Sequence, residues 1–370
     1  MNKTVWGHII RSVLALLMIV IIVLGCYLEY VVCQYYRIED KQVLVIEDRT
    51  SLSLDMSKTY TISTYNIGFG AYEQDYSFFM DEGYMKDGTY VKGEYAKAKS
   101  KDVVMTNTNG SISTIENLNS DFIFFQEVDK EATRSYKVNQ YEMILDSFGE
   151  YDATYASNFH SAYLLYPFND VIGKTEAGIV TLSKYDIDSS VRYSLPIDES
   201  FPTRFFDLDR CISINRIKLD NSKELVLINV HLSAYDEGGV YRKKQLELLN
   251  SILKEEYDKG NYVIAGGDFN HDIASSLNTF KTEQQVPEWV YVLEDKDLVN
   301  GYKFASAKNI PTCRSTDMPY AKDVNYSVVL DGFIVSDNVK INEVKNISQE
   351  NGELFLYSDH NPVKMSFVLI

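Results

Sequence analysis

The chain ends in ELFLYSDHNPVKMSFVLI (Glu353–Ile370), where a polar turn separates two apolar runs. Leu354–Tyr357 are apolar, and Val363–Ile370 are apolar or alternate with polar residues, which predicts a strand on each side of the turn. Asp, Asn and Pro are common in turns, so the turn by itself is compatible with a purely structural role. Whether its acid and histidine, Asp359 and His360, do chemistry depends on what the other strands bring to the same place.

Several other apolar runs also end in polar residues of the same few types. These residues are Asn66 after YTISTY, Glu127 after DFIFFQ, Asn229 and His231 in ELVLINVHL, Asp268 and Asn270 in YVIAGGDFN, and Asp331 in VVLDGFIVS. Each alone has a structural explanation, as a turn, a solvated strand end or a buried histidine. Independent turns give no reason for carboxylates, amides and histidines to follow successive strands, so the set predicts one site.

The residue types also predict the chemistry of that site. Glu127 and Asp359 are hard oxygen donors, which suit Mg²⁺. Zinc is disfavoured because it prefers clusters of His or Cys, and the chain holds five histidines and no Cys-x-x-Cys pair. Asp268 can orient and deprotonate a water, and Asn270 can donate to a phosphoryl oxygen. Asp331 can fix the tautomer of His360.

The remaining pattern predicts the fold class. Many strands with a few helices, and no strict alternation of strand and helix, indicate an α/β sandwich of packed sheets. Leu246, Leu249, Leu253 and Tyr257 mark one helical face, and Gly260 is a natural helix C-cap. We expect further helices at ISTIENL and around residues 132–148, and a long functional loop over residues 71–110. No break in composition divides residues 59–370, which predicts one domain.

The ordered motifs resemble the endonuclease/exonuclease/phosphatase superfamily over roughly residues 59–370. They are Asn-Ile at Asn66, Gln-Glu-Val at Glu127, Asn-Val-His-Leu at His231, Gly-Asp-Phe-Asn at Asp268 and Asn270, Leu-Asp-Gly-Phe at Asp331, and Ser-Asp-His-x-Pro at Asp359 and His360. That group includes deoxyribonuclease I, apurinic endonucleases, inositol polyphosphate 5-phosphatases and neutral sphingomyelinases. The resemblance implies a four-layer α/β/β/α sandwich of two packed mixed sheets and Mg²⁺-dependent cleavage of a phosphoester by an in-line water.

The resemblance also implies a role for each matching residue. Glu127 and Asp359 match metal ligands, with Asn66 as a ligand or as a partner of the ligands. Asp268 matches the residue that positions the water, and Asn270 matches a phosphate contact. His231 and His360 match the histidines that stabilise the transition state or serve the leaving group, and Asp331 matches the acid that orients the last histidine.

The substrate is marked less clearly. The loops with which nucleases of the superfamily hold DNA are not recognisable, and Gly178–Ile187 and Phe205–Ile217 look more like membrane-associated relatives of the sphingomyelinase type. Lys184, Arg210 and Arg314 are candidate phosphate contacts, with surface or structural roles as the alternative. Tyr163–Phe168 is interpreted as core packing, with an apolar rim for lipid as the second interpretation.

The N-terminus predicts a membrane anchor. Ser12–Leu28 is uncharged and long enough to span a bilayer. We expect a cytoplasmic segment at residues 1–11, a transmembrane helix at 12–33 and a stalk at 34–58. Because Lys3 and Arg11 precede the span, the N-terminus is placed inside and the catalytic domain outside. A signal segment, or a lipoprotein acylated at Cys26 in VLGC, is the alternative.

Charge favours a small or lipid substrate over a nucleic acid. Net charge is −17, and the first 38 residues contribute +2, so the rest carries about −19, which opposes binding to a DNA backbone. We therefore expect a Mg²⁺-dependent phosphodiesterase or phosphatase, with Mn²⁺ as a possible substitute, that acts outside the membrane on a phospholipid headgroup or small phosphoester. The alternatives are a metal-dependent nuclease acting on DNA or RNA, and a non-catalytic binding module.

Overall fold

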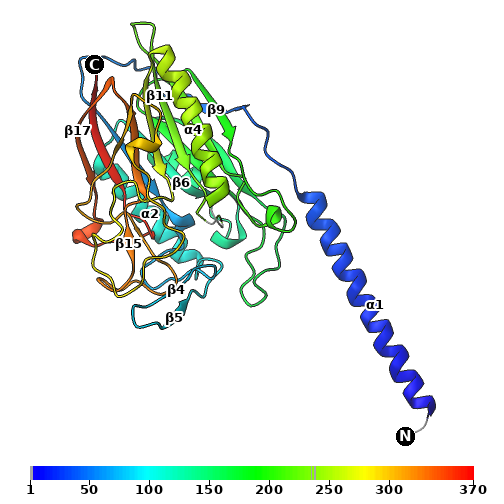
Figure 1. The fold of residues 1–370 in the computed structure, drawn as a ribbon. Helices are drawn as coiled ribbons and strands as arrows, with labels where there is room; N and C mark the ends of the chain where they lie inside the picture. Colours follow the sequence, from blue (N-terminus) through cyan, green and yellow to red (C-terminus); the bar gives the residue numbers. More distant parts are fainter. Residues whose placement is uncertain (1–2, 235, 237–238) are drawn as a thin grey trace.

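The computed structural model describes residues 3–234, 236 and 239–370. An N-terminal helix, α1 (Lys3–Gln34), projects from a body made of strands with three further long helices (Figure 1). Within the described residues the strands of the body form two seven-stranded sheets and two small two-stranded ribbons.

The first sheet has the order β1-β9-β10-β11-β12-β16-β13. Its strands are β1 (Gln42–Val43), β9 (Ser189–Ser194), β10 (Cys211–Lys218), β11 (Glu224–His231), β12 (Tyr262–Asp268), β16 (Asp331–Ser336) and β13 (Tyr302–Ala305). β11 and β12 are parallel, and their other neighbours are antiparallel, so the sheet is mixed.

The second sheet has the order β17-β18-β3-β6-β8-β7-β2. Its strands are β17 (Val339–Asn346), β18 (Val363–Leu369), β3 (Tyr60–Asn66), β6 (Phe122–Asp129), β8 (Glu176–Ser183), β7 (Asp152–His160) and β2 (Ile46–Glu47). Here β3 and β6 are the parallel pair. The ribbons pair β4 (Glu82–Tyr84) with β5 (Tyr90–Lys92), and β14 (Cys313–Arg314) with β15 (Ser327–Val328).

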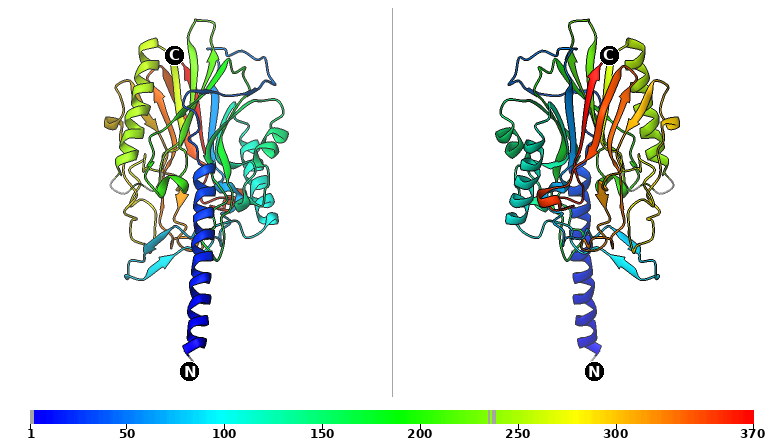
Figure 2. Two further views of the ribbon diagram at one scale, coloured as in Figure 1. Left: turned by 90° about the vertical axis from the view of Figure 1, so that its right-hand side faces the viewer. Right: turned by 90° about the vertical axis from the view of Figure 1, so that its left-hand side faces the viewer.

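The layers follow from alternation of side chains along the strands. On β6, Phe122 and Phe124 face β11 and β12 in the core between the sheets, whereas Ile123 and Phe125 face outward. The outward faces are covered by helices, which is why these strands are apolar on both sides. α4 (Val240–Lys259) covers the first sheet, and α2 (Lys101–Leu118) with α3 (Gln140–Ser147) covers the second. The predicted α/β/β/α sandwich is confirmed (Figure 2).

Some of the predicted helix boundaries agree with the structure and others differ from it. Gly260 ends α4 with φ +70, as expected of a C-cap. The predicted loop over residues 71–110 is wrong in its last part, because α2 begins at Lys101 after the N-cap Ser100, whose side chain accepts from the Val103 amide. The segment has low helix propensity, but burial of its apolar face against β3 and β6 outweighs that.

Two more local differences have packing causes. Gly110 lies in the middle of α2, where a Cβ would come within 2.5 Å of the Tyr357 ring, so glycine lets that ring pack against the helix. The helix predicted around residues 132–148 is shorter: α3 spans Gln140–Ser147, and Thr133–Ser135 form a separate 3₁₀ turn. That turn is tied to β6 by the ion pair of Arg134 with Asp129 at 2.9 Å.

The segment predicted as a stalk, residues 34–58, is not detached from the body. β1 pairs with β9 in the first sheet, and β2 pairs with β7 in the second. Arg37 donates to Asp209 at 2.8 Å, and Leu44 is buried beside Ile179. The chain after α1 therefore lies along one edge of both sheets, because its backbone groups find partners there.

α1 itself is long and apolar. An 18-residue window within Val5–Gln34 has a mean hydropathy of 2.8, and the 30 residues extend about 45 Å, more than a bilayer core of about 30 Å. Such a length and composition suit a membrane span and a signal sequence alike. The described part of the helix leaves the body at the end opposite Ile370 (Figure 2).

Candidate active site

Asp268 is the meeting point of the polar residues that follow the strands. It is the last residue of β12, and in the register of the first sheet it lies beside His231 of β11 on one side and Asp331 of β16 on the other. Gly267 precedes it with φ +141, and a Cβ there would come within 2.0 Å of the Val230 carbonyl oxygen. Glycine at this position therefore lets β12 approach β11 closely enough to set Asp268 beside His231.

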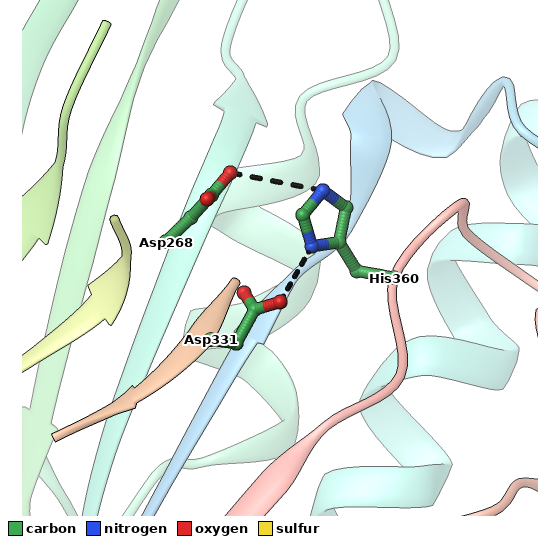
Figure 3. Close-up of side chains that lie close together, drawn as sticks. All are labelled: Asp268, Asp331 and His360. Carbon is green, nitrogen blue, oxygen red and sulfur yellow. Dashed lines mark hydrogen bonds and ion pairs between the residues drawn. The ribbon is translucent and has the colours of Figure 1, made fainter. Parts of the chain in front are cut away.

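His360 lies between two carboxylates (Figure 3). Its Nδ1 is 2.8 Å from Asp331 Oδ2, and its Nε2 is 3.7 Å from Asp268 Oδ2. Burial opposes protonation of this imidazole, but the Asp331 charge outweighs burial and raises the pKa of His360 well above 6.5. His360 is thus held as an imidazolium whose Nε2–H faces Asp268.

Glu127 reaches the site through a break in β6. The pairing of β6 with β8 shifts between Phe125 and Val128, and Glu127 adopts φ +56, which is rare for a residue other than glycine. The bulge turns the Glu127 carboxylate toward Asp268. The Asn66 amide lies between the two, donating to Glu127 Oε1 at 3.2 Å and to Asp268 Oδ2 at 3.0 Å. Asn66 therefore orients both carboxylates with its amide nitrogen.

Asp359 is held by the turn that the end of the chain forms. Ser358 donates to the Asn66 carbonyl at 2.8 Å, and Arg314 donates its backbone amide to the Asp359 carbonyl at 3.0 Å. These contacts fasten the turn to β3 and β14. Burial raises the pKa of Asp359, and burial together with the Asp359 charge raises the pKa of Glu127. Asp359 and Glu127 thus lie close enough to repel each other.

The second histidine differs from the first. His231 Nε2 is 3.6 Å from Asp268 Oδ2 and 3.9 Å from Glu127 Oε1. Burial, with Arg210 and His360 adding to it, lowers the pKa of His231 well below 6.5. Its Nδ1 is buried and has no hydrogen-bond partner among the described residues. The pKa values of the two imidazoles are therefore shifted in opposite directions, down for His231 and up for His360.

Asn270 completes the Asp268 turn. Its backbone amide donates to Asp268 Oδ1 at 2.8 Å, and its side-chain nitrogen donates to the Leu232 carbonyl at 2.8 Å. Its φ of +50 places it in the left-handed region, which Asn tolerates better than most residues. Burial raises the pKa of Asp268 to about 6, although His360 opposes that shift.

Glu127, Asp268, Asn270, Asp359 and both histidines line one cavity of about 130 Å³, whereas Asn66 and Asp331 are not among its lining residues. The carboxylates of Glu127, Asp268 and Asp359 form its acidic side, together with both histidines and Asn270. Phe69, Tyr72, Phe78 and Trp289 form an apolar part of the wall.

Comparison with known proteins places this geometry in a family. The sequence model of the endonuclease/exonuclease/phosphatase family matches residues 64–360. The chain belongs to this family. Its members are metal-dependent hydrolases of phosphoester bonds, and this chain is one of them. No curated protein sequence matches the chain.

Solved structures agree with the family on the fold. Truncated TDP2 from Caenorhabditis elegans is 16% identical and covers 85% of this chain and 100% of its own, with a TM-score of 0.50. TDP2 from D. rerio, complexed with single-strand DNA product, is 14% identical and covers 84% and 99%, with a TM-score of 0.51. A family protein from Leptotrichia buccalis C-1013-b is 14% identical and covers 83% and 99%, with a TM-score of 0.53.

The donors fit the divalent metal that members of the endonuclease/exonuclease/phosphatase family use. Glu127 and Asp359 are half-buried carboxylates that repel each other, and a divalent cation between such groups relieves the repulsion. Asp268, Asp331 and His360 also lie within 4.8 Å of one another. His360 is a weaker candidate ligand than the carboxylates, because the Asp331 charge keeps it protonated and a metal-binding imidazole is neutral.

Of the three side chains predicted as phosphate contacts, two lie at the cavity and one does not. Arg210 and Arg314 line the cavity, and Arg210 Nε and Nη1 are buried without a hydrogen-bond partner among the described residues. Lys184 does not reach the site: β8 runs antiparallel to β6, so Lys184 follows the end of β8 that lies beside Phe122, and its Nζ donates to Asn119 at 2.7 Å. The prediction of Lys184 as a phosphate contact is therefore wrong.

Several residues that line the cavity were not marked by the sequence, among them Arg134 and Asn158. Arg134 lies in a stretch predicted as helix, and Asn158 lies inside β7, where its Nδ2 is buried without a partner in the described part of the chain. Neither follows an apolar run in the way that marked the other site residues. A polar residue in a buried strand was the only signal for Asn158.

Proposed function

We propose that this chain is a membrane-anchored, Mg²⁺-dependent phosphodiesterase or phosphatase that acts outside the membrane on a phospholipid headgroup or small phosphoester. The observation that carries the proposal is the cavity, which is lined by the carboxylates of Glu127, Asp268 and Asp359, by two histidines, and by arginine nitrogens that have no hydrogen-bond partner among the described residues.

The proposed roles follow from the distances. Asp268, to which Asn66, His231 and His360 converge, positions the attacking water and accepts its proton. His360, charged through Asp331, donates to a phosphoryl or leaving-group oxygen, where negative charge grows. Arg210 and Asn158 present unpaired N–H groups to the other phosphoryl oxygens.

Glu127 and Asp359 would hold the Mg²⁺, with Asn66 orienting Glu127. When bound, the ion supplies Lewis-acid stabilisation of charge on a phosphoryl oxygen. Mn²⁺ prefers the same oxygen donors and would replace it.

The small-substrate part of the proposal rests on where the cations lie. Arg134 is paired with Asp129, and Arg314 donates to the carbonyls of Ser315 and Glu73, so the cations of the site are committed inside the cavity. A protein that holds a nucleic acid backbone instead needs several cations along an open groove. A second candidate is a nuclease, which the likeness to TDP2 in complex with single-strand DNA product favours.

The test is a substrate panel given to the full chain in phosphatidylcholine vesicles with Mg²⁺ at physiological salt. The panel contains phospholipids, sphingomyelin, small soluble phosphodiesters and phosphomonoesters, single-stranded DNA and duplex DNA. The proposal expects a lipid or small phosphoester to be hydrolysed with a higher kcat/KM than either DNA. Cleavage of DNA without turnover of any other compound would establish the nuclease instead.

A further inference from the structure

An exposed apolar surface surrounds the place where α1 meets the body. Residues 161–172 expose the side chains of Tyr163, Leu165, Tyr166 and Phe168, and the neighbouring residues 197–208 expose Phe201 and Phe206. We call these six residues the collar. Phe168 is 86% exposed and Phe201 is 63% exposed. The interpretation of Tyr163–Phe168 as core is therefore wrong for four of its residues, although Leu164 is buried.

The collar is joined directly to α1. Tyr27 of the helix accepts from the Leu165 amide at 3.0 Å, and Tyr30 accepts from the Tyr163 amide at 3.1 Å. Val31 of the helix is buried in one cluster with Ala162 and Phe205, which come from the two collar loops. The end of α1 is thus a fixed part of the body.

These bonds set the depth of the collar. The uncharged stretch Ser12–Leu28 of α1 extends about 25 Å, close to the thickness of a bilayer core. Tyr27 and Tyr30 lie at its outer end, where tyrosines gather between hydrocarbon and headgroups. Tyr163 and Leu165, whose amides donate to these two tyrosines, therefore lie at the same depth in the bilayer.

The charge of residues 161–172 agrees with that depth, whereas the second collar loop also carries Asp198, Glu199, Arg204 and Asp207. Within residues 161–172 the one charged side chain is Asp170, which is ion-paired with Lys97 at 3.1 Å. Tyr166 and Phe168 contact each other as an edge-to-face pair with ring centroids 6.4 Å apart. The loop therefore presents aromatic surface with no unpaired charge, which suits the interfacial region of a lipid bilayer.

We propose that the collar rests in the outer interface of the bilayer that α1 spans, so that the body is held against the membrane at two adjoining places. This inference rests on the membrane anchoring in the proposed function. It has a consequence for the site: β18 begins at Val363, next to the His360 turn, and ends near Ile370, the end farthest from α1. The His360 end of β18 is thereby held nearer the membrane than the Ile370 end.

The test uses the full chain in phosphatidylcholine vesicles, with an environment-sensitive fluorophore attached to one cysteine. Cys26→Ser and Cys33→Ser remove the exposed cysteines, while Cys211 and Cys313 are buried. The labelled variants are Phe168→Cys and Phe201→Cys. The matched control is Ile370→Cys, because Ile370 is 63% exposed and lies at the far end of the body (Figure 2).

The collar predicts blue-shifted emission at positions 168 and 201, and quenching by nitroxide-labelled lipid several-fold stronger than at position 370. Water-exposed labels at both positions in a chain that floats with the vesicles would overturn the collar alone. A lipid-embedded label at only one position would overturn the two-loop surface. A chain that does not float would overturn the anchoring and the collar together, while hydrolysis of a soluble phosphodiester by the same sample tests the catalytic proposal separately.

Discussion

Replacing Asp331 with Asn removes a charge while keeping the shape of the side chain. In the wild type, Asp331 Oδ2 lies 2.8 Å from His360 Nδ1, and both groups are buried. The Asn oxygen can still accept from Nδ1, so the tautomer and the position of the ring are retained. What is lost is the stabilisation of the imidazolium.

The size of that loss follows from the geometry. At an effective dielectric constant of about 20, unit charges about 4 Å apart attract by about 4 kcal/mol, which is an upper value. A hydrogen bond to a charged group contributes about 1–2 kcal/mol more than a neutral one. We therefore expect kcat to fall by about 30- to 1000-fold for a loss of about 2–4 kcal/mol.

The pH dependence gives a second readout. Because the Asp331 charge raises the pKa of His360, the active imidazolium persists in the wild type until pH rises through that high pKa. In Asp331→Asn the burial of the ring lowers the pKa, so activity is lost at a lower pH as pH rises. The assay is the initial rate on a soluble chromogenic phosphodiester with Mg²⁺ between pH 5 and 9.

The control is Asp258→Asn, which removes an exposed carboxylate paired with Lys254 on α4 and leaves the rate unchanged. Thermal unfolding checks that Asp331→Asn is folded. A folded Asp331→Asn variant with kcat within about threefold of wild type and the same pH profile would refute the reasoning.

Three further outcomes are expected. Chelation with EDTA abolishes hydrolysis and either Mg²⁺ or Mn²⁺ restores it, because the half-buried carboxylates Glu127 and Asp359 repel each other and a divalent cation relieves that repulsion. Full activity in the chelated enzyme would contradict the metal assignment. Burial alone would raise the pKa of Glu256, but hydrogen bonds from Arg216 and other donors lower it to about 2, so the pair stabilises the fold above about pH 4.5 and this contribution is lost as pH falls from 4.5 to 2. With a discount for the partly exposed Arg216, urea unfolding of Glu256→Gln at pH 7 shows a loss of about 2 kcal/mol that shrinks below pH 4.5, and a pH-independent difference would contradict this. Because a positive flank predicts that the catalytic domain lies outside, we expect protease added to intact cells to digest it; protection until lysis would reverse the topology.

The strand-end residues could be predicted because each follows a buried apolar run, and the order of their motifs is that of one family. Asp268, Asp331, His231 and His360 meet as a consequence of strand register, which the sequence pattern implies once the sheets are assumed. The order of strands in each sheet is a property of long-range pairing, and no local pattern encoded it.

The wrong predictions also have physical causes. Lys184 was assigned to the site by its place after a strand, but that strand runs antiparallel to β6 and ends at the opposite edge. α2 was partly missed because packing, not propensity, stabilises it. Tyr163–Phe168 was interpreted as core because aromatic composition alone does not distinguish a buried side chain from an exposed one.

The central claim is that Asp268 activates a water for phosphoester hydrolysis in this cavity. The most direct measurement is the initial rate of Asp268→Asn and wild-type chains, both in vesicles with saturating Mg²⁺, on the best substrate of the panel. Asn keeps the hydrogen bonds that Asp268 accepts through one oxygen but cannot take a proton, so the account predicts a loss of at least about 100-fold in kcat with an unchanged unfolding temperature. A folded variant that turns over at the wild-type rate would contradict it.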